Sequence, residues 1–184
     1  MSWYKSLSRR QFIQLGAAAT AAMGVSCNRN CASLNPWRFL TVDEARTLAA
    51  ICDQLIPPDQ DAGASWARVV NYLDIQLCGP FVHLRNTYRR ALVSFDRSVR
   101  ARFGKAFASL SSDQQISFLR AMEANEVAPS GWSGISPFAF FELLLNHTMQ
   151  GYYGDPRHGG NRDRASWKMV GLCYPPIRGR QHYA

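Results

Sequence analysis

Apolar residues recur at helical spacing along most of the chain, and the first clear stretch begins at Thr41. Glu44 follows three residues later, and the two together form the pattern of a capping box at a helix N-terminus. Pro57 and Pro58 end the stretch. This segment therefore predicts an amphipathic helix. Its inward positions are Val42, Ala45, Leu48, Ala49, Cys52 and Leu55.

Two further helices are predicted before residue 105. The first extends from about Ser65 to Leu77 and ends before the Gly79-Pro80 pair. The second extends from about Phe81 to Phe103, and Gly104 is expected to be its C-cap. The inward side of the first is expected to comprise Trp66, Val69, Val70, Leu73 and Leu77, and that of the second Phe81, Leu84, Tyr88, Leu92, Phe95, Val99 and Phe103.

The second half of the chain predicts two more helices. Ser112 with Gln115 is expected to open one of them. After a loop rich in Gly, Pro and Ser, the Ser136-Pro137 pair is expected to cap the other, which extends over residues 138–150 and is closed by Gly151. No segment alternates with period two for long enough to predict a strand. The predicted fold is all-α, a small irregular helical bundle with a long C-terminal arm rich in Gly and aromatic residues.

The N-terminus carries the pattern of an export signal. Ser8, Arg9, Arg10 and Phe12 fit the twin-arginine motif, and a mildly apolar segment follows over residues 12–25. That segment is too short and too weakly apolar for a stable membrane span, which needs roughly 20 strongly apolar residues. We therefore predict export in a folded state by the twin-arginine translocase, and a periplasmic location. The alternative is a short buried helix.

Cys27 lies where processing of such a signal is expected. The preceding Gly24-Val25-Ser26 suits cleavage by a signal peptidase, and it also resembles a lipobox that ends in an acylated cysteine. Both alternatives stay open, and acylation of Cys27 would associate the protein with the cytoplasmic membrane. Either way we predict a signal peptide over residues 1–26 and a single helical domain over residues 27–184.

Four other cysteines leave two interpretations open. Cys31, Cys52, Cys78 and Cys173 form an even set, which would allow two disulfides in an oxidising compartment. Cys52 lies on the apolar face of the first predicted helix, where a buried free thiol is equally expected.

The chain is basic, with a formal net charge of +8, of which the leader supplies +3. Much of the remainder lies on the third predicted helix, opposite its apolar side. A solvated helix face accounts for this pattern, and contact with an acidic partner or with anionic lipid headgroups is the alternative. Nucleic acid is not expected as a partner, because no binding motif accompanies the charge. The basic positions are Arg85, Arg89, Arg90, Arg97 and Arg100.

The segment over residues 151–171 combines glycine, charge and aromatic side chains in a density that an ordinary connector does not need. Glycines permit close backbone approach, and Tyr and Trp suit buried anchors of an interface. Its order, G-Y-Y-G-D-P-x-x-G-G-N-R-D-x-x-x-W-K-x-x-G, resembles the C-terminal signature of the gluconate 2-dehydrogenase subunit 3 family. Residues 40–58 resemble the family's first helix, so the resemblance covers most of the chain.

The resemblance implies a non-catalytic small subunit of an FAD-dependent sugar or alcohol dehydrogenase complex. The partner implied is a GMC-type catalytic subunit that carries the FAD, with a cytochrome c subunit as a further candidate. This chain itself is expected to bind no cofactor and no metal. No C-x-x-C-H haem motif and no G-x-G-x-x-G flavin fingerprint occurs in it.

The same segment supplies the predicted partner-binding residues. We expect its aromatic residues to bury against the partner or to brace the loop that does, while its polar residues hold the loop by hydrogen bonds. Closure of the bundle's own core by the aromatic residues is the alternative. The predicted residues are Tyr152, Tyr153, Asp155, Arg157, Asn161, Arg162 and Trp167.

Two other classes of function remain open from the residues alone. A small exported enzyme would use His147, His158, His182, Asp155 and Asp163, although no metal-binding spacing joins them. A stand-alone anchored or periplasmic binding module would instead use the basic helix face. A neighbouring gene for a flavoprotein without its own signal would favour the accessory subunit.

Overall fold

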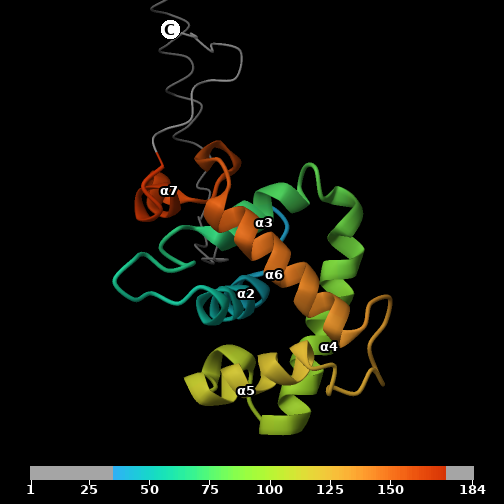
Figure 1. Ribbon diagram of the computed structural model, residues 1–184. Helices are drawn as coiled ribbons and strands as arrows, with labels where there is room; N and C mark the ends of the chain where they lie inside the picture. The colour runs from blue at the N-terminus through green and yellow to red at the C-terminus, as the bar shows by residue number, and fades with distance from the viewer. Residues whose placement is uncertain (1–34, 173–184) are drawn as a thin grey trace, which may run out of the picture. The chain divides into compact units, whose positions relative to one another are not determined.

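Residues 35–172 are described by a computed structural model, and their regular structure is entirely helical (Figure 1). The predicted all-α bundle is thus confirmed. Residues 173–184 of the predicted arm lie outside the described range, as do Ser8, Arg9, Arg10, Phe12 and Cys27. The helices are α2 (Val42–Leu55), α3 (Val69–Leu77), α4 (Arg85–Phe103), α5 (Ser112–Glu123), α6 (Pro137–Tyr153) and α7 (Ala165–Met169), with short 3₁₀ turns η1 (Val82–Leu84), η2 (Phe107–Ser109), η3 (Pro156–His158) and η4 (Arg162–Arg164).

Helix α6 is the central element of the bundle (Figure 1). It packs against α2, α3, α4 and α5, and its C-terminal end meets α7. Because α6 carries apolar residues on most of its circumference, it can be covered on several sides. The glycine-rich segment starts at the end of α6 that lies beside α3 and α7.

The core is built mainly from aromatic side chains contributed by different helices. Phe95 of α4 packs against Phe107 with ring centroids 5.1 Å apart and against Phe118 at 5.3 Å. Tyr88 lies edge-on to Phe140 of α6 at 5.8 Å. These contacts join α4 to η2, α5 and α6, as the predicted apolar stripe on residues 81–103 required.

The helix caps match the sequence at three ends and differ at a fourth. Ser136 caps α6 and Pro137 is its first residue, as predicted. Thr41 and Glu44 form the predicted capping box, and Gly104 ends α4 in the left-handed conformation. At α5 the box is made by Ser111 and Gln114, one residue earlier than predicted. The reason is that Gln115 faces inward and donates a hydrogen bond to the Phe107 carbonyl at 2.9 Å.

The predicted end of α6 at Gly151 is wrong, because the helix continues to Tyr153. Gly151 is a buried helical residue instead, and a Cβ added there would lie 2.8 Å from the Tyr72 ring and 3.1 Å from Val69. The missing side chain lets α3 and α6 approach closely. A packing requirement, and not a helix stop, therefore accounts for this glycine.

The predicted start of the second helix is also wrong. Residues 65–68 form a turn, α3 begins at Val69, and Arg68 precedes it with a left-handed φ of 60°. Trp66, expected on the inner face, is therefore 45% exposed. The third helix likewise starts later, since η1 precedes Arg85.

The arginines of α4 are not simply a solvated face. Arg85 donates to the Leu77 carbonyl at 2.6 Å, Arg89 forms an ion pair with Glu44, and Arg100 bonds to Asp96 at 2.7 Å. Arg90 bonds to the Ser133 hydroxyl, and Arg97 donates to the Gly131 carbonyl at 3.4 Å. Arg100 pairs within α4, whereas the other four bond to neighbouring segments. Arg90, Arg97 and Arg100 are exposed, as a solvated face predicts, while Arg85 and Arg89 are partly buried in contacts with other segments.

Hydrogen bonds to a buried carboxylate hold the segment before α2 in place. Asp74 of α3 is 2% exposed and accepts hydrogen bonds from the backbone N–H groups of Arg38, Phe39 and Leu40, at 2.7, 2.9 and 3.0 Å. These bonds compensate the cost of burying the carboxylate. Arg89 adds a bond to the Phe39 carbonyl at 2.9 Å and lies over its ring.

Cys52 and Cys78 are both free thiols. The two-disulfide interpretation is therefore wrong for them, and Cys31 and Cys173 lie outside the described residues. Burial of Cys52 raises the pKa of its thiol to about 12, although Thr148 offers it a weak hydrogen bond at 3.4 Å. Cys52 thus serves as a small apolar core residue.

Candidate functional site

The glycine-rich segment after α6 folds back onto the bundle as η3, η4 and α7 (Figure 1). Asn161 lies at its centre, fully buried and in the left-handed conformation with φ 42°. Its backbone N–H donates to the Gly151 carbonyl at 2.9 Å and its side-chain amide to the Gly154 carbonyl at 2.8 Å. Its side-chain oxygen accepts from the Ser166 N–H at 3.1 Å. One residue thus joins the end of α6 to the start of α7.

Two adjacent glycines let this loop lie directly on the helices. A Cβ at Gly160 would lie 2.1 Å from the Gly151 carbonyl oxygen, a backbone atom that cannot move aside. Gly159 has φ 96°, and a Cβ there would lie 2.5 Å from Ile75. Asn71 of α3 donates to the Gly159 carbonyl at 2.7 Å. Gly159 and Gly160 are therefore explained by close packing within this chain.

Asp155 shapes the first turn of the loop. Its carboxylate accepts from the Arg157 backbone N–H at 2.9 Å and from the Arg157 guanidinium at 2.9 and 2.6 Å. These hydrogen bonds lower the pKa of Asp155 to about 2. The Arg157 side chain remains 70% exposed although it is bonded to Asp155.

The three aromatic residues of the motif differ in exposure. Tyr152 is 2% exposed and its hydroxyl donates to the Ala62 carbonyl. Trp167 is 8% exposed and its indole N–H donates to the Tyr153 carbonyl at 2.9 Å. Tyr153 itself is 39% exposed. In this chain Tyr152 and Trp167 therefore support the loop from within, while Tyr153 reaches solvent.

Arg162 connects the loop to the turn before α3. Its backbone N–H donates to the Ala67 carbonyl at 3.2 Å, and its guanidinium lies 5.0 Å from the ring centroid of Trp66. Both members of this cation–π pair are partly exposed, the Arg162 side chain at 44% and Trp66 at 45%. Asp163 is its nearest carboxylate, at 3.6 Å.

The candidate histidine and aspartate residues have different partners. His147 is buried, shares a 2.8 Å hydrogen bond with the Tyr88 hydroxyl and stacks on Phe81 at 4.4 Å. Burial lowers the pKa of His147, and proximity to His83 lowers it further. Asp155 and Asp163 instead lie beside arginines of the loop, His158 is exposed, and His182 lies outside the described residues. Within residues 35–172 no group of His, Cys, Asp or Glu side chains could hold a metal ion.

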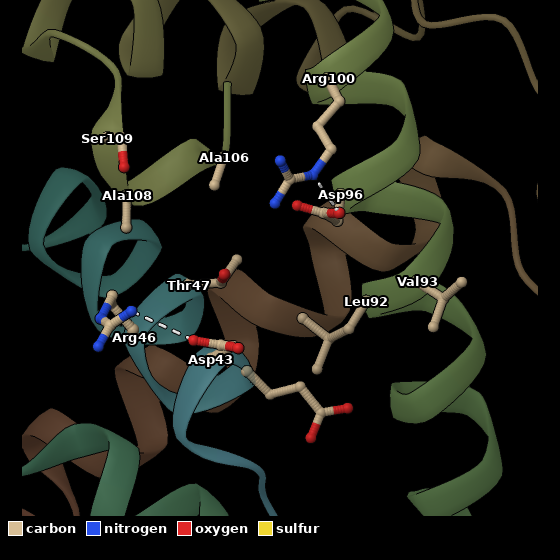
Figure 2. A pocket seen from close by; sticks show the side chains of 11 residues that line it. Asp43, Arg46, Thr47, Leu92, Val93, Asp96, Arg100, Ala106, Ala108 and Ser109 are labelled. Carbon is tan, nitrogen blue, oxygen red and sulfur yellow. Dashed lines mark hydrogen bonds and ion pairs between the residues drawn. The ribbon is translucent and has the colours of Figure 1, made fainter. Parts of the chain in front are cut away.

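A separate hollow of about 400 Å³ lies between α2, α4 and η2 (Figure 2). Figure 2 shows Arg46 pointing to Asp43 and Arg100 to Asp96, at 3.2 and 2.7 Å. Its remaining carboxylate, Glu44, pairs with Arg89. Because each charge already has a partner in the chain, this hollow offers no unmatched charge to a ligand.

The sequence did not indicate the surface around Trp66 and Arg68. The apolar spacing over residues 65–77 suited one continuous helix, which would have turned Trp66 inward. Only the left-handed conformation of Arg68 breaks that helix, and an arginine carries no local signal for such a conformation.

Comparison with known families assigns the chain. A sequence model described as gluconate 2-dehydrogenase subunit 3 matches residues 42–173. The chain therefore belongs to the gluconate 2-dehydrogenase subunit 3 family. A second model, the signal sequence of the twin-arginine translocation pathway, matches residues 6–26 and supports export across the cytoplasmic membrane.

Neither a curated protein nor a solved structure matches the chain. Among the described residues, no helix is both long and apolar enough to cross a membrane.

Proposed function

We propose that this chain is a non-catalytic accessory subunit that binds an FAD-dependent dehydrogenase of the GMC type in the periplasm. The single observation that carries the proposal is the family match over residues 42–173, next to an export signal on the same chain. The partner holds the FAD and performs the oxidation. This chain stabilises the partner and takes it through the translocase, which transports folded proteins.

The loop after α6 supplies the surface for this role. Arg157 and Arg162 of this loop, with Tyr153 at the end of α6, are exposed side chains of the types common at interfaces. Tyr152, Asn161 and Trp167 hold the loop from inside, so these exposed groups are presented on a fixed backbone. A rigid surface loses less entropy on binding.

A cytochrome c subunit is a further proposed partner, because it would accept the electrons that leave the flavin. Membrane association is proposed through an acyl group on Cys27 or through such a subunit. The proposed partner-binding surface is compatible with both ways of membrane association.

Co-purification tests the proposed function. A C-terminal tag on this chain, expressed in its native host, is expected to recover a second polypeptide with flavin absorbance and sugar or alcohol dehydrogenase activity. A cytosolic expression of this chain without residues 1–26 serves as the control for folding. Recovery of the chain alone from both the periplasmic and the membrane fractions would contradict the proposal.

A further inference from the structure

The turn before α3 and the loop after η3 meet in a rigid junction. Of five non-glycine residues with left-handed φ in the described range, four lie here: Arg68, Asn161, Asp163 and Arg164. Such conformations persist only where surrounding contacts hold them. The bond from Arg162 N–H to the Ala67 carbonyl joins the two segments directly. The side chains of this junction are therefore attached to a rigid backbone.

The side chain of Trp66 in this junction is partly exposed to solvent. It is 45% exposed although it is among the largest apolar side chains of the protein, and Arg162 covers only one part of it. Tryptophan and arginine are the residue types most enriched where interfaces derive their binding energy. An exposed pair of them on a rigid backbone is a typical interface anchor.

A cavity of about 350 Å³ is lined by Ser65 and Arg68, which lie on either side of Trp66 in the turn before α3. Its apolar walls include Trp37, Ala45, Ala49 and Val70, from the segment before α2, from α2 itself and from α3. A space of this size with mostly apolar walls accommodates one large apolar side chain or a comparable group.

Three polar residues complete the lining of the cavity, and two of them are already engaged. The Ser65 hydroxyl donates to Asp53 at 2.6 Å, and the Asn71 amide donates to the Gly159 carbonyl at 2.7 Å. The Arg68 backbone is hydrogen-bonded to Ser65 and Tyr72, but its side chain has no hydrogen bond or ion pair with another residue of the range 35–172. Its guanidinium is the one charged group among the residues that line this cavity, and its natural ligand is a carboxylate.

We propose that this surface, defined as Trp66, Arg68, Arg162 and the cavity walls, binds a segment of the partner polypeptide that carries an apolar side chain followed closely by Asp or Glu. The apolar side chain fills the cavity, the carboxylate pairs with Arg68, and the adjoining backbone lies against Trp66. The proposal rests on the proposed function, because it names the partner segment. A free small ligand would leave Trp66 uncovered, since Trp66 lies outside the cavity.

The position of this surface supports the same occupant. Asn71 bonds to Gly159 and Arg162 to Ala67, so the segments that form this surface are joined directly to the loop that carries Arg157. The hollow in Figure 2 is larger, yet all its charges are paired within the chain. Of these two hollows, only the cavity beside Arg68 therefore has an unpaired charge to offer a carboxylate.

A peptide library tests the proposal on the full exported chain alone. Twelve-residue random peptides displayed on phage are selected against the immobilised protein. We expect the enriched peptides to place Asp or Glu within two residues of a large apolar side chain. We expect Arg68→Glu to weaken their binding at least tenfold and Ala49→Trp, which fills the cavity, to abolish it.

Two matched variants separate the charge effect from general damage. Arg68→Lys keeps the positive charge and should retain most of the binding. Arg120→Glu makes the same charge reversal on an exposed arginine of α5 that does not line the cavity and should bind as the unmodified chain does. Enriched peptides without a carboxylate, equal binding to Arg68→Glu, or no enrichment at all would each overturn the proposal. Thermal melting of every variant checks that the fold is retained.

Co-purification with the same variants separates this proposal from the function on which it rests. If the unmodified chain recovers the flavoprotein and Arg68→Glu recovers less than a tenth as much, both are supported. Equal recovery with both chains overturns the surface and leaves the accessory function intact. Failure of the unmodified chain to recover any flavoprotein contradicts the function, while the peptide selection still decides the surface.

Discussion

At the residue scale, the family motif is explained first by the stability of this chain. Asn161 illustrates this, because its backbone and side chain satisfy three groups that would otherwise be buried without partners. Buried polar groups are costly unless they are hydrogen-bonded. The same motif can therefore contain buried residues that stabilise the loop and exposed residues that contact a partner.

Asn161→Ala should lower the free energy of unfolding by about 2–4 kcal/mol, since two buried side-chain hydrogen bonds are lost and a left-handed residue is strained. Asn125→Ala is the matched control, because Asn125 is also left-handed, with φ 57°, but is exposed and has no side-chain hydrogen bond. Urea denaturation of both variants measures the difference. A loss no greater than that of the control would show that the bonds of Asn161 contribute little.

Trp66 and Arg68 show what a single backbone conformation changes. With helical φ at residue 68, the helix would extend toward Ser65 and Trp66 would be expected to face the core. The left-handed conformation of Arg68 ends that continuity, and the tryptophan becomes a surface residue. One torsion angle thus converts an expected core position into part of the proposed binding surface.

At the element scale, buried and partly buried charges position whole segments. Asp74 holds residues 38–40 through three backbone bonds, and this segment carries Trp37, a wall of the proposed cavity. Two exposed charges, Arg90 and Arg97, also bond to the loop before α6. The charges of α4 therefore contribute to tertiary structure as well as to solubility.

Asp74→Ala should destabilise the fold by about 3 kcal/mol, because hydrogen bonds to a charged group are strong and the freed N–H groups lose their partner. Hydrogen exchange should accelerate first at the amides of Arg38, Phe39 and Leu40. Asp113→Ala in the exposed first turn of α5 is the control and should cost less than about 1 kcal/mol. Unchanged exchange at residues 38–40 would contradict the role given to Asp74.

At the scale of the whole molecule, the strong basic balance belongs mainly to the chain ends. Residues 35–172 contain fifteen Lys and Arg against thirteen Asp and Glu, a net charge of +2, whereas the full chain has +8. The described bundle therefore has no large excess of positive charge. This weakens the alternative of a basic module that binds lipid or acidic surfaces through general attraction.

Replacing Arg9 and Arg10 together by Lys should keep both this chain and its partner in the cytoplasm, because Lys retains the charge and loses the planar guanidinium. Cell fractionation with immunoblots for both polypeptides measures the distribution. Lys5→Arg, which also conserves charge but leaves the pair intact, should be exported normally. Normal periplasmic or membrane levels of the double variant would remove the export assignment.

The sequence by itself determined the features that depend on nearby residues. Helical periodicity and the Thr41–Glu44 cap act between residues at most four positions apart, so they predicted the helical class and the first cap. The order of the C-terminal motif and the twin arginines likewise indicated the family and the export route, and both were matched.

The tertiary structure alone decided the features that depend on residues far apart in the chain. Gly151 looked like a helix stop, but its role comes from Tyr72, a residue of another helix. The exposure of Trp66, the pairing of the α4 arginines and the burial of Asn161 depend on equally distant partners. Local sequence patterns contain no record of these partners, because packing and hydrogen bonds form only when the chain has brought the segments together.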